Sequence, residues 1–275
     1  MDIINKIINK DILEGLKDIP DGVVTLSIQS PPYNLKIGYD SINDDQPYGS
    51  YLIWLKEVFS EVYRVTKHGG RCAINIDAMT NRQEDKDQEY VRCIYAHLYN
   101  LMKEIGWKFR TEICWYKQNA VGKQTAWGSW ISSSNPIIRR THEYLLIFSK
   151  GDWKLEGDSE LSDMTKKEFN DFTFSTWFIS PETKKPGNHP APFPEQLVYR
   201  LIKLFSYRDD IILDPFNGSG TTTAVAASLC RKWIGIDNST KYVDFAIKRT
   251  NLEYSKCVQL EIINPYIKRS ERLKK

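Results

Sequence analysis

The sequence predicts an α/β protein in which a largely parallel sheet carries helices on both faces. Short apolar runs alternate with segments of helical periodicity over most of the 275 residues, as expected for strands buried between two layers of helices. The contents of 41% hydrophobic and 27% charged residues are those of an ordinary globular chain, which argues against a disordered or fibrous protein. A strand, a glycine turn and a helix also follow one another near residue 218, an arrangement typical of a ligand site.

The expected strands and helices follow the chain in alternation. Apolar runs predict strands at residues 23–28, 72–76, 109–116, 144–148, 210–213 and 233–236. Residues 51–67 and 195–206 each place their apolar side chains on one helical stripe, so we expect both helices to pack on the sheet.

Two segments interrupt this alternation and are expected to be insertions. Residues 118–138 are rich in Gly, Ser, Gln and Trp, whereas residues 151–186 are polar without the period of a strand or a helix. Long segments of this kind within a domain are usually functional. Residues 108–150 carry a local charge of +5, while the formal charge of +3 resides in the basic tail, which we expect to be solvated. A global polycation is excluded, but a local basic face is not.

The cysteines are far apart and include no CxxC pair. We therefore expect neither a disulfide framework nor a metal site, and interpret them all as small buried hydrophobic residues: Cys72, Cys93, Cys114, Cys230 and Cys257. No stretch approaches the roughly 20 apolar residues that span a bilayer, and the first residues lack the pattern of a signal peptide. The sequence thus predicts a cytoplasmic protein without a membrane partner.

A ligand-binding turn is expected at residues 210–224. The strand ends at Asp214, glycines stand at 218 and 220, and threonines open a helix. Glycines let a ligand approach the backbone, and a helix N-terminus offers unpaired N–H groups. Asp237 ends the next strand, where a carboxylate can accept both hydroxyls of a ribose. A dinucleotide site would have a third glycine where Thr223 stands, so the turn favours a ligand with a positively charged amino group, such as S-adenosylmethionine (AdoMet). A purely structural turn is the alternative for the glycine pair alone.

A rigid turn follows the first expected strand. Pro31 and Pro32 lack N–H donors and fix the backbone, so we expect their carbonyl groups to point outward at the carboxyl end of the strand. Ser30 and Tyr33 flank them. A hydroxyl with fixed carbonyls can hold an exocyclic amino group, and the ring can stack on the base that carries it. A simple strand-ending turn is the alternative.

Together, the two turns resemble the beta class of the amino-DNA methyltransferase family, in which the catalytic turn precedes the AdoMet turn. The resemblance is carried by Ser30-Pro31-Pro32-Tyr33 and by Asp214-Pro215-Phe216-Asn217-Gly218-Ser219-Gly220-Thr221-Thr222. Similar stretches begin at Asn9, Arg64, Glu112, His142 and His189. The resemblance therefore covers most of the chain.

This resemblance implies the Rossmann-like fold of AdoMet-dependent methyltransferases, circularly permuted, with a mixed seven-stranded sheet and inserted target-recognition loops. Residues 144–148 would form its one antiparallel strand, paired with residues 109–116. The implied parts are residues 1–117 as the catalytic part, 118–138 and 151–186 as target-recognition insertions, 139–150 and 187–256 as the remainder with the AdoMet site, and 257–275 as a C-terminal extension.

The resemblance also implies a set of cofactor-binding residues. These are Asp11 at the adenine, Asp214, Phe216, Gly218 and Gly220 around the methionine part, with Ser219 and Thr221 in the same turn, Asp237 at the ribose, and His189, Pro190 and Phe193 in a stretch that closes over AdoMet. Asp237 departs from the glutamate typical of the family, which is one methylene longer.

The catalytic turn predicts methylation of an exocyclic amine. Such amines are poor nucleophiles because the ring delocalises their lone pairs. If Ser30 Oγ and the Pro31 carbonyl accept the amino hydrogens, the lone pair is aimed at the methyl group, and the surplus proton is expected to leave to solvent. No Pro-Cys pair occurs, which disfavours C5-cytosine methylation. In the family, Ser at the first position is typical of N4-cytosine enzymes and Asp or Asn of N6-adenine enzymes, so we predict N4-cytosine, with N6-adenine as the alternative.

Double-stranded DNA is the expected partner, with the target base flipped out of the duplex. Candidates for phosphate contacts are Lys117, Lys123, Arg139, Arg140, Lys184 and Lys185. Trp127 and Trp130 could stack on DNA or anchor their loop. The enzyme would act with a cognate restriction endonuclease or as an orphan methylase. Alternatives are a non-catalytic DNA-binding regulator, a methyltransferase for RNA or protein amides, and a nicotinamide dehydrogenase.

Overall fold

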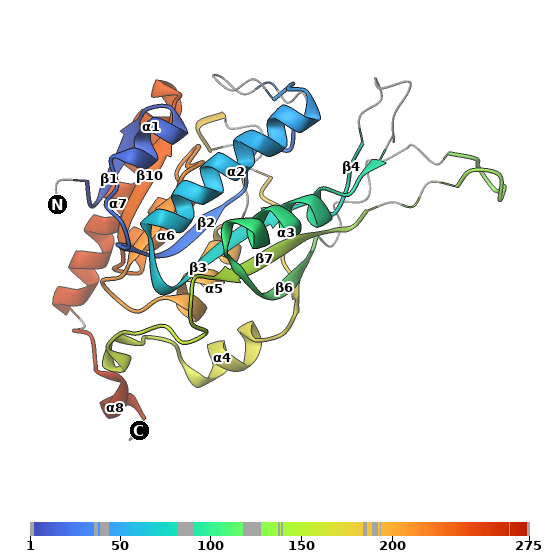
Figure 1. The fold of residues 1–275 in the computed structure, drawn as a ribbon. Coiled ribbons are helices and arrows are strands. Elements are labelled where there is room, and N and C mark those ends of the chain that lie inside the picture. Colours follow the sequence, from blue (N-terminus) through green and yellow to red (C-terminus); the bar gives the residue numbers. More distant parts are fainter. Residues whose placement is uncertain are drawn as a thin grey trace.

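The computed structural model describes residues 3–35, 38, 44–81, 91–117, 128–136, 138, 140–183, 186–188, 192, 194–263 and 265–273. Its centre is an eight-stranded sheet with the order β1-β10-β9-β2-β3-β7-β6-β8 (Figure 1). The strands are β1 Lys6–Asn9, β2 Val24–Gln29, β3 Thr66–Ile76, β4 Thr80–Asn81, β5 Val91–Arg92, β6 Lys108–Tyr116, β7 His142–Ser149, β8 Thr176–Phe178, β9 Ile211–Asp214 and β10 Lys232–Asp237. The α-helices are α1 Ile12–Lys17, α2 Tyr48–Val65, α3 Ile94–Ile105, α4 Lys166–Phe172, α5 Glu195–Phe205, α6 Thr221–Ser228, α7 Thr240–Ile263 and α8 Arg269–Arg272.

Strand β7 is the antiparallel member of this sheet. It runs antiparallel to β3 and to β6, while all other neighbouring strands in the sheet pair in parallel. The expected antiparallel strand at residues 144–148, and its pairing with residues 109–116, are therefore confirmed. Every strand expected from an apolar run is present, and β3 begins earlier than expected, at Thr66.

Two strands have no counterpart among the expected apolar runs. Strand β1 provides the seventh strand that the resemblance implied, and β8 is an eighth, formed within residues 151–186. Both are edge strands, of four and three residues. Such short strands give too few alternating positions for a periodic signal. Helix α4 was also unexpected, although Thr165 and Glu168 form a capping box at its start, a signal that the sequence does carry.

The helices cover both faces of the sheet and enclose two apolar cores. Helices α1, α2 and α3 contribute to one core, whereas α5 and α6 contribute to the other. Strand β7 contributes side chains to both cores, because successive side chains of a strand point to opposite faces of the sheet. Leu146 and Phe148 lie in the first core, and Leu145 and Ile147 lie in the second. The amphipathic stripes predicted for α2 and α5 are thus confirmed as sheet-facing.

The connections diverge at the centre of the sheet. From β2 the chain continues through α2 to β3 on one side, and from the neighbouring β9 it continues through α6 to β10 on the other (Figure 1). Open α/β sheets bind ligands at the carboxyl ends of strands at such a switch point. Ser27 pairs in register with Leu213, so the turns that begin at Ser30 and Asp214 leave the sheet side by side.

The beginning of the 151–186 segment lies at the opposite, amino edge of the sheet. Leu161 accepts a hydrogen bond from the backbone N–H of Arg208, just before β9, at 3.1 Å. Asp163 receives two hydrogen bonds from the guanidinium of Arg231, just before β10, at 2.5 and 2.9 Å. This part of the segment is therefore anchored away from the edge at which β2 and β9 end.

The C-terminal tail packs on the same segment, contrary to the expectation of a solvated tail. Tyr266 Oη donates to the carbonyl oxygens of Glu160 and Ser162 at 2.6 and 3.0 Å. The guanidinium of Arg272 also donates to the Ser162 carbonyl. Arg272, a basic residue of the tail, thus has a structural role.

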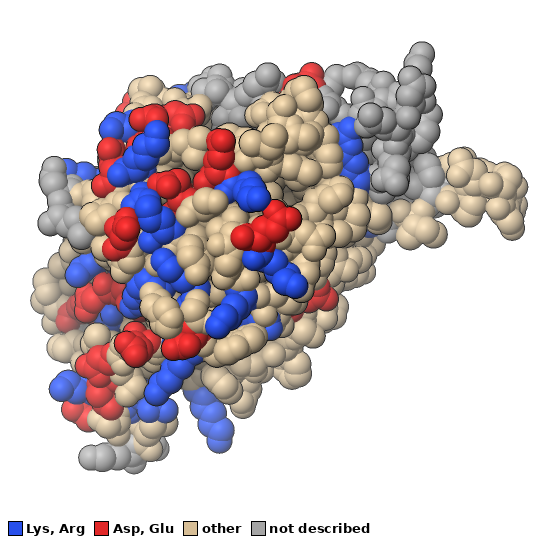
Figure 2. All heavy atoms as spheres, in the orientation of Figure 1, with Lys and Arg blue, Asp and Glu red and all other residues tan. Residues whose placement is uncertain are grey.

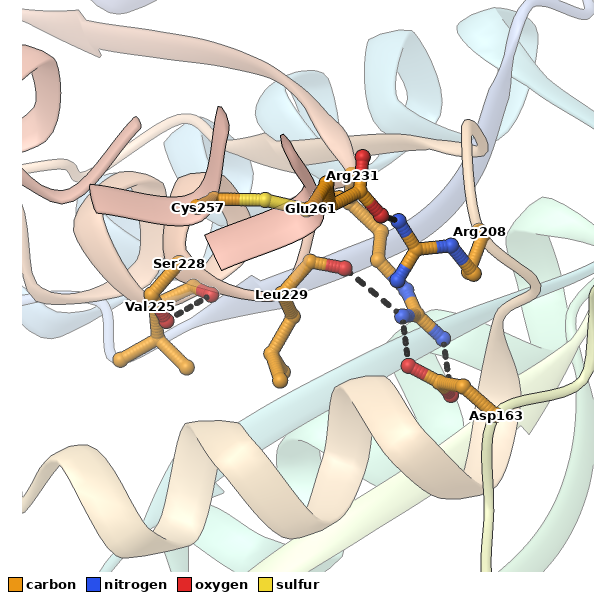
Figure 3. The surroundings of a disulfide bond; sticks show 9 residues. Asp163, Arg208, Val225, Ser228, Leu229, Arg231, Cys257 and Glu261 are labelled. Carbon is orange, nitrogen blue, oxygen red and sulfur yellow. Dashed lines mark hydrogen bonds and ion pairs between the residues drawn. A yellow bond between two sulfur atoms is a disulfide. The ribbon is translucent and has the colours of Figure 1, made fainter. Parts of the chain in front are cut away.

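A disulfide joins Cys230, after α6, to Cys257 in α7, with Cα atoms 6.2 Å apart (Figure 3). The prediction of unpaired, buried cysteines is wrong for this pair and for Cys93, which is exposed, while Cys114 is only partly buried. The two partners are 27 positions apart, and only the packing of α6 on α7 brings them together. Figure 3 shows ion pairs beside the bond, Arg231 with Asp163 and Arg208 with Glu261.

Candidate functional site

The proline turn follows a fully buried strand and is fixed by a hydrogen bond from α2. All residues of β2 are buried, as are Pro31 and Pro32, while Ser30 and Tyr33 are partly exposed. Tyr51, on the buried stripe of α2, donates its hydroxyl to the Pro32 carbonyl at 2.7 Å. The expectation that both proline carbonyls point outward is thus wrong for Pro32, because a hydroxyl from α2 satisfies it. The turn is fixed by a helix as well as by its prolines.

The loop after Tyr33 is tied at its base. The backbone N–H groups of Asn34 and Leu35 donate to the carboxylate of Asp44 at 2.7 and 3.0 Å. The side chain of Asn34 exchanges two hydrogen bonds, each of 2.8 Å, with the backbone of Gln46. These bonds hold the turn next to the start of α2.

Polar groups from three strands meet at the Tyr33 hydroxyl. It accepts from Ser30 Oγ at 3.3 Å and from Asn75 Nδ2 at 3.1 Å, and it lies 3.4 Å from Glu143 Oε2. Asn75 is at the end of β3, and Glu143 is at the start of β7. Lys117, just after β6, forms an ion pair with Glu143. Sequence reasoning identified Ser30, Tyr33 and Lys117, but it missed the two residues that connect them.

The glycine turn is closed by Asp237. The N–H of Gly218 donates to Asp237 Oδ2 at 2.8 Å, and the N–H of Ser239 donates to Oδ1 at 2.9 Å. Asp237 thereby ties the end of β10 to the glycine turn. Gly220 caps α6 with a positive φ of 78°, and a Cβ there would lie 2.7 Å from the Cβ of Ala246. Only glycine fits this close approach of α7.

A cavity of about 190 Å³ lies at this turn, between the carboxyl ends of the strands and α2. It brings together three residues predicted to bind the cofactor, Asp11, Phe216 and Asp237. Its lining is Lys10, Asp11, Ile12, Gln46, Trp54, Pro215, Phe216, Ile236, Asp237 and Asn238. The ring centroids of Trp54 and Phe216 are 5.8 Å apart and the rings are nearly perpendicular. Sequence reasoning missed Trp54 because this residue lies off the apolar stripe of α2. A large aromatic residue outside that stripe is nevertheless a sequence signal for a ligand contact.

The carboxyl group of Asp214 is deeply buried beside the cavity. The backbone N–H of Phe216 donates to its Oδ1 at 3.0 Å. Burial nevertheless raises the pKa of Asp214 to about 7, and the neighbouring charge of Asp237 acts in the same direction. A buried carboxyl that titrates near neutral pH is typical of a functional site. It is suited to pair with a cationic group that enters the site.

The buried polar groups of the turn fit AdoMet. Within the described part of the chain, both side-chain polar atoms of Asn217 have no hydrogen-bond partner, so the turn has capacity left for a polar ligand. Arg249 of α7 supports the turn from outside by donating to the Ser219 carbonyl at 3.1 Å and to Thr221 Oγ1 at 3.3 Å. Sequence reasoning missed Arg249.

The predicted DNA-contacting residues are only partly described. Lys117 and Arg140 lie at the carboxyl edge of the sheet, Lys117 paired with Glu143 and Arg140 with Asp77. Several predicted residues lie outside the described residues: Lys123, Arg139, Lys184 and Lys185, as do His189, Pro190 and Phe193 of the predicted cofactor lid. Trp127 is also outside them, while Trp130 is 66% exposed.

The charge of residues 108–150 does not form a single face. Lys108, Arg110 and Lys150 belong to the amino edge, where β6 begins and β7 ends, away from Lys117 and Arg140. On the face seen in Figure 2, positive and negative side chains are interspersed. None of the described helices is both long and apolar enough to cross a membrane.

A cavity at the switch point of the sheet, beside a glycine turn and a rigid proline turn, is the arrangement of an α/β enzyme that binds a nucleoside-like cofactor. The family described as DNA methylase matches residues 24–248. The chain belongs to this DNA methylase family of N4 and N6 methyltransferases.

Individual relatives agree with this assignment. The type II methyltransferase M.MjaVI of Methanocaldococcus jannaschii is 34% identical over 179 residues, 65% of this chain and 87% of that protein. The DNA adenine methyltransferase YhdJ of Escherichia coli K12 is 28% identical over 265 residues, 90% of this chain and 82% of that protein. TTHA0409 of Thermus thermophilus, solved in complex with S-adenosyl-L-methionine, is 26% identical with a TM-score of 0.73 and covers 96% of both chains.

Proposed function

We propose that this AdoMet-dependent DNA methyltransferase transfers a methyl group to the exocyclic N4 of a flipped cytosine in a specific duplex sequence. The observation that carries the proposal is the direction of the hydrogen bond at Ser30. Its hydroxyl donates to Tyr33, which leaves the lone pairs of Oγ to accept hydrogen bonds. An acceptor at this position suits an amino group, whose hydrogens it would hold while the lone pair of the nitrogen turns toward the methyl donor.

Different residues of the proposed cofactor site would hold different parts of AdoMet. AdoMet supplies an electrophilic methyl group when bound. Asp214 would pair with its ammonium group, Asp237 would accept its ribose hydroxyls, and Asp11 would accept from its adenine. Phe216 and Trp54 line the cavity at the same level and would exclude water from the adenosine part. Because β2 and β9 are neighbours in register, the turn that begins at Asp214 lies beside the turn that begins at Ser30.

The choice of cytosine rests on Ser30, since a serine in this turn is typical of N4-cytosine enzymes in the family. The second candidate is methylation of adenine N6. It is supported by the name of YhdJ, a DNA adenine methyltransferase that resembles this chain over most of its length. An acceptor hydroxyl suits the amino group of either base, so the product nucleoside decides between them.

The test of the target base is a product analysis. The purified protein is incubated with AdoMet and plasmid DNA from a host that lacks DNA methyltransferases, and the digested nucleosides are separated by mass spectrometry. We expect N4-methylcytosine in wild type and none with Ser30→Ala. N6-methyladenine without N4-methylcytosine would overturn the choice of cytosine, and the absence of any methylated nucleoside would favour a non-catalytic DNA-binding protein.

We further propose that phosphate contacts hold the duplex while the base is flipped, a step that costs about a few kcal/mol. The candidates are Lys117, Lys123, Arg139, Arg140, Lys184 and Lys185. The anchored position of residues 151–165 favours residues 118–138 and the end of the second insertion as the parts that read the sequence. A cognate restriction endonuclease is the proposed functional partner if the enzyme is not an orphan methylase.

The DNA face is tested by the salt dependence of binding. A variant in which Lys123, Arg139, Lys184 and Lys185 are all replaced by Gln is compared with wild type on the same plasmid DNA. Each lost phosphate contact should reduce the slope of log K against log salt by about 1. An unchanged slope would remove these residues from the DNA face.

A further inference from the structure

A line of hydrogen bonds leads from the proposed substrate amine into the protein. It begins at Ser30 Oγ, which donates to Tyr33 Oη at 3.3 Å, and continues from Tyr33 Oη to Glu143 Oε2 at 3.4 Å. The three groups come from the end of β2 and the start of β7, which β3 separates in the sheet. The line therefore exists only through the tertiary fold.

The bonds at Tyr33 give this line a direction. A phenol hydroxyl has one proton and can accept two hydrogen bonds. Tyr33 Oη accepts from Ser30 Oγ and from Asn75 Nδ2, at 3.3 and 3.1 Å. Tyr33 Oη in turn donates toward the Asn75 carbonyl at 3.2 Å and the Glu143 carboxylate at 3.4 Å. An ionised carboxylate is the stronger acceptor, so the hydroxyl protons are ordered from Ser30 toward Glu143.

Glu143 is held in place by an ion pair and by a hydrogen bond. Its side chain is 13% exposed, its Oε2 accepts from Asn75 Nδ2 at 2.8 Å, and its other oxygen pairs with Lys117. The charged groups that face it are Lys117 from the end of β6 and Asp77 from the end of β3, and Asp77 is itself paired with Arg140. The remaining exposure of Glu143 gives a route to water.

We propose that Glu143 receives the proton that the methylated amine loses, through the hydroxyls of Ser30 and Tyr33. This inference rests on the proposed amino-group chemistry of Ser30. As the nitrogen–methyl bond forms and the sulfur–methyl bond breaks, the nitrogen carries one proton too many. That proton passes to Ser30 Oγ, the Ser30 proton passes to Tyr33 Oη, and the Tyr33 proton passes to Glu143. Both hydroxyls end neutral, and Glu143 ends as a carboxylic acid that returns its proton to water. Solvent is thus the final acceptor rather than the direct one.

Asn75 and Lys117 are positioning residues in this scheme. Asn75 Nδ2 donates to both Tyr33 Oη and Glu143 Oε2, so it fixes the distance between them. Lys117 stabilises the carboxylate before transfer. Once Glu143 is neutral, Lys117 lacks its counter-charge, which favours return of the proton to water.

The test is the single-turnover rate of methyl transfer to unmethylated plasmid DNA by Glu143→Gln, whose amide keeps the shape but cannot take a proton. We expect a fall of about a hundredfold, at the lower end of general acid–base effects, with an unchanged affinity for AdoMet. Glu112→Gln is the matched control, because Glu112 also accepts from a tyrosine, Tyr95, but lies outside the site. Its rate should equal that of wild type.

Two further measurements distinguish a proton path from a merely structural contact. Tyr33→Phe keeps the ring but breaks the line, so it should slow transfer as much as Glu143→Gln, and the double variant should lose no more than either alone. In mixtures of H₂O and D₂O, wild type should show a solvent isotope effect with a curved dependence on deuterium content, because several protons move together. Glu143→Gln should lose that curvature.

A Glu143→Gln rate within twofold of wild type, or fully additive losses in the double variant, would overturn the proton path. If Glu143→Gln fails to fold, Tyr33→Phe and the isotope effect of wild type carry the same test. Failure of wild type to methylate any amino group would instead overturn the proposed function. The two failures are therefore distinguishable.

Discussion

Two aspartates at opposite edges of the sheet, the partly buried Asp163 and the fully buried Asp214, have opposite pKa shifts. At the amino edge, burial would raise the pKa of Asp163, but Arg231 together with Lys203 and Arg208 outweighs burial, and the pKa lies below its ordinary value. At the carboxyl edge, burial raises the pKa of Asp214 to about 7, and Asp237 adds to the shift. The comparison teaches that a compensated buried charge anchors a segment, whereas an uncompensated one retains affinity for a ligand.

The amino-edge anchor is expected to give the largest change in stability. Arg231 has a side chain with no exposed surface, and Asp163 is its bidentate partner. Asp163→Asn would leave that guanidinium without its counter-charge, and we expect the free energy of unfolding to fall by about 3–5 kcal/mol. Denaturant unfolding measures the loss. The exposed Asp171→Asn in the same segment is the control, with a change within about 0.5 kcal/mol. Equal effects of the two variants would contradict the anchor.

The disulfide should have the next largest effect, and only while it is oxidised. It closes a loop between positions 27 apart, for which cross-linking contributes about 2–4 kcal/mol. Cys230→Ser should lower the free energy of unfolding by this amount in non-reducing buffer and leave it unchanged in excess dithiothreitol. Cys93→Ser, at an exposed free thiol, is the control. Alkylation of all five cysteines after denaturation without a reductant would contradict the bond.

The carboxyl edge is tested by the pH dependence of AdoMet binding. Below pH 7 the carboxyl of Asp214 is mostly neutral, so binding a cationic amino group must release a proton. We expect the affinity to increase about tenfold between pH 6 and 8, the factor for a group with a pKa near 7 that binds only when ionised. Calorimetry in two buffers measures both the affinity and the released proton. Asp214→Asn should bind weakly with no such dependence.

The same carboxyl should have the opposite effect on the stability of the free protein. Its pKa is 3.8 in the reference state and about 7 in the fold, so between these values the folded chain holds a proton that the unfolded chain has released. Its contribution to stability therefore falls as the pH rises from about 4 to 7. Asp214→Asn should remove this decline. A parallel increase of stability and AdoMet affinity with pH, lost together in this variant, would contradict the shift.

The smallest change in stability is expected at the contact between α6 and α7. Thr223 of α6 and Thr250 of α7 share a buried hydrogen bond of 2.9 Å. Thr250→Val should cost about 1 kcal/mol, or about 2–4 °C in Tm for a chain of this size. AdoMet affinity should change less than for Asp214→Asn. A larger loss of affinity than of stability would show that α7 supports the glycine turn more directly than this comparison implies.

Much of the site was predictable because its signals are local. The motifs at Ser30 and Asp214 combine residue types with special backbone needs, and the acid at Asp237 follows at the end of the next strand. Arg249, Trp54 and Glu143 were not predictable in the same way, since each acts on a turn far away in the chain. The disulfide between Cys230 and Cys257 was missed for the same reason.

The sequence by itself determined the alternation of strands and helices, the order of the two turns and the family, because these depend on periodicity and on short motifs. Only the tertiary structure decided which groups meet. It placed Glu143 at the Tyr33 hydroxyl, separated the basic residues of 108–150 onto opposite edges, and anchored residues 151–165 away from the site. The physical reason is that hydrogen bonds and ion pairs act over a few ångströms in space, whereas the partners here are separated by tens to hundreds of residues along the chain.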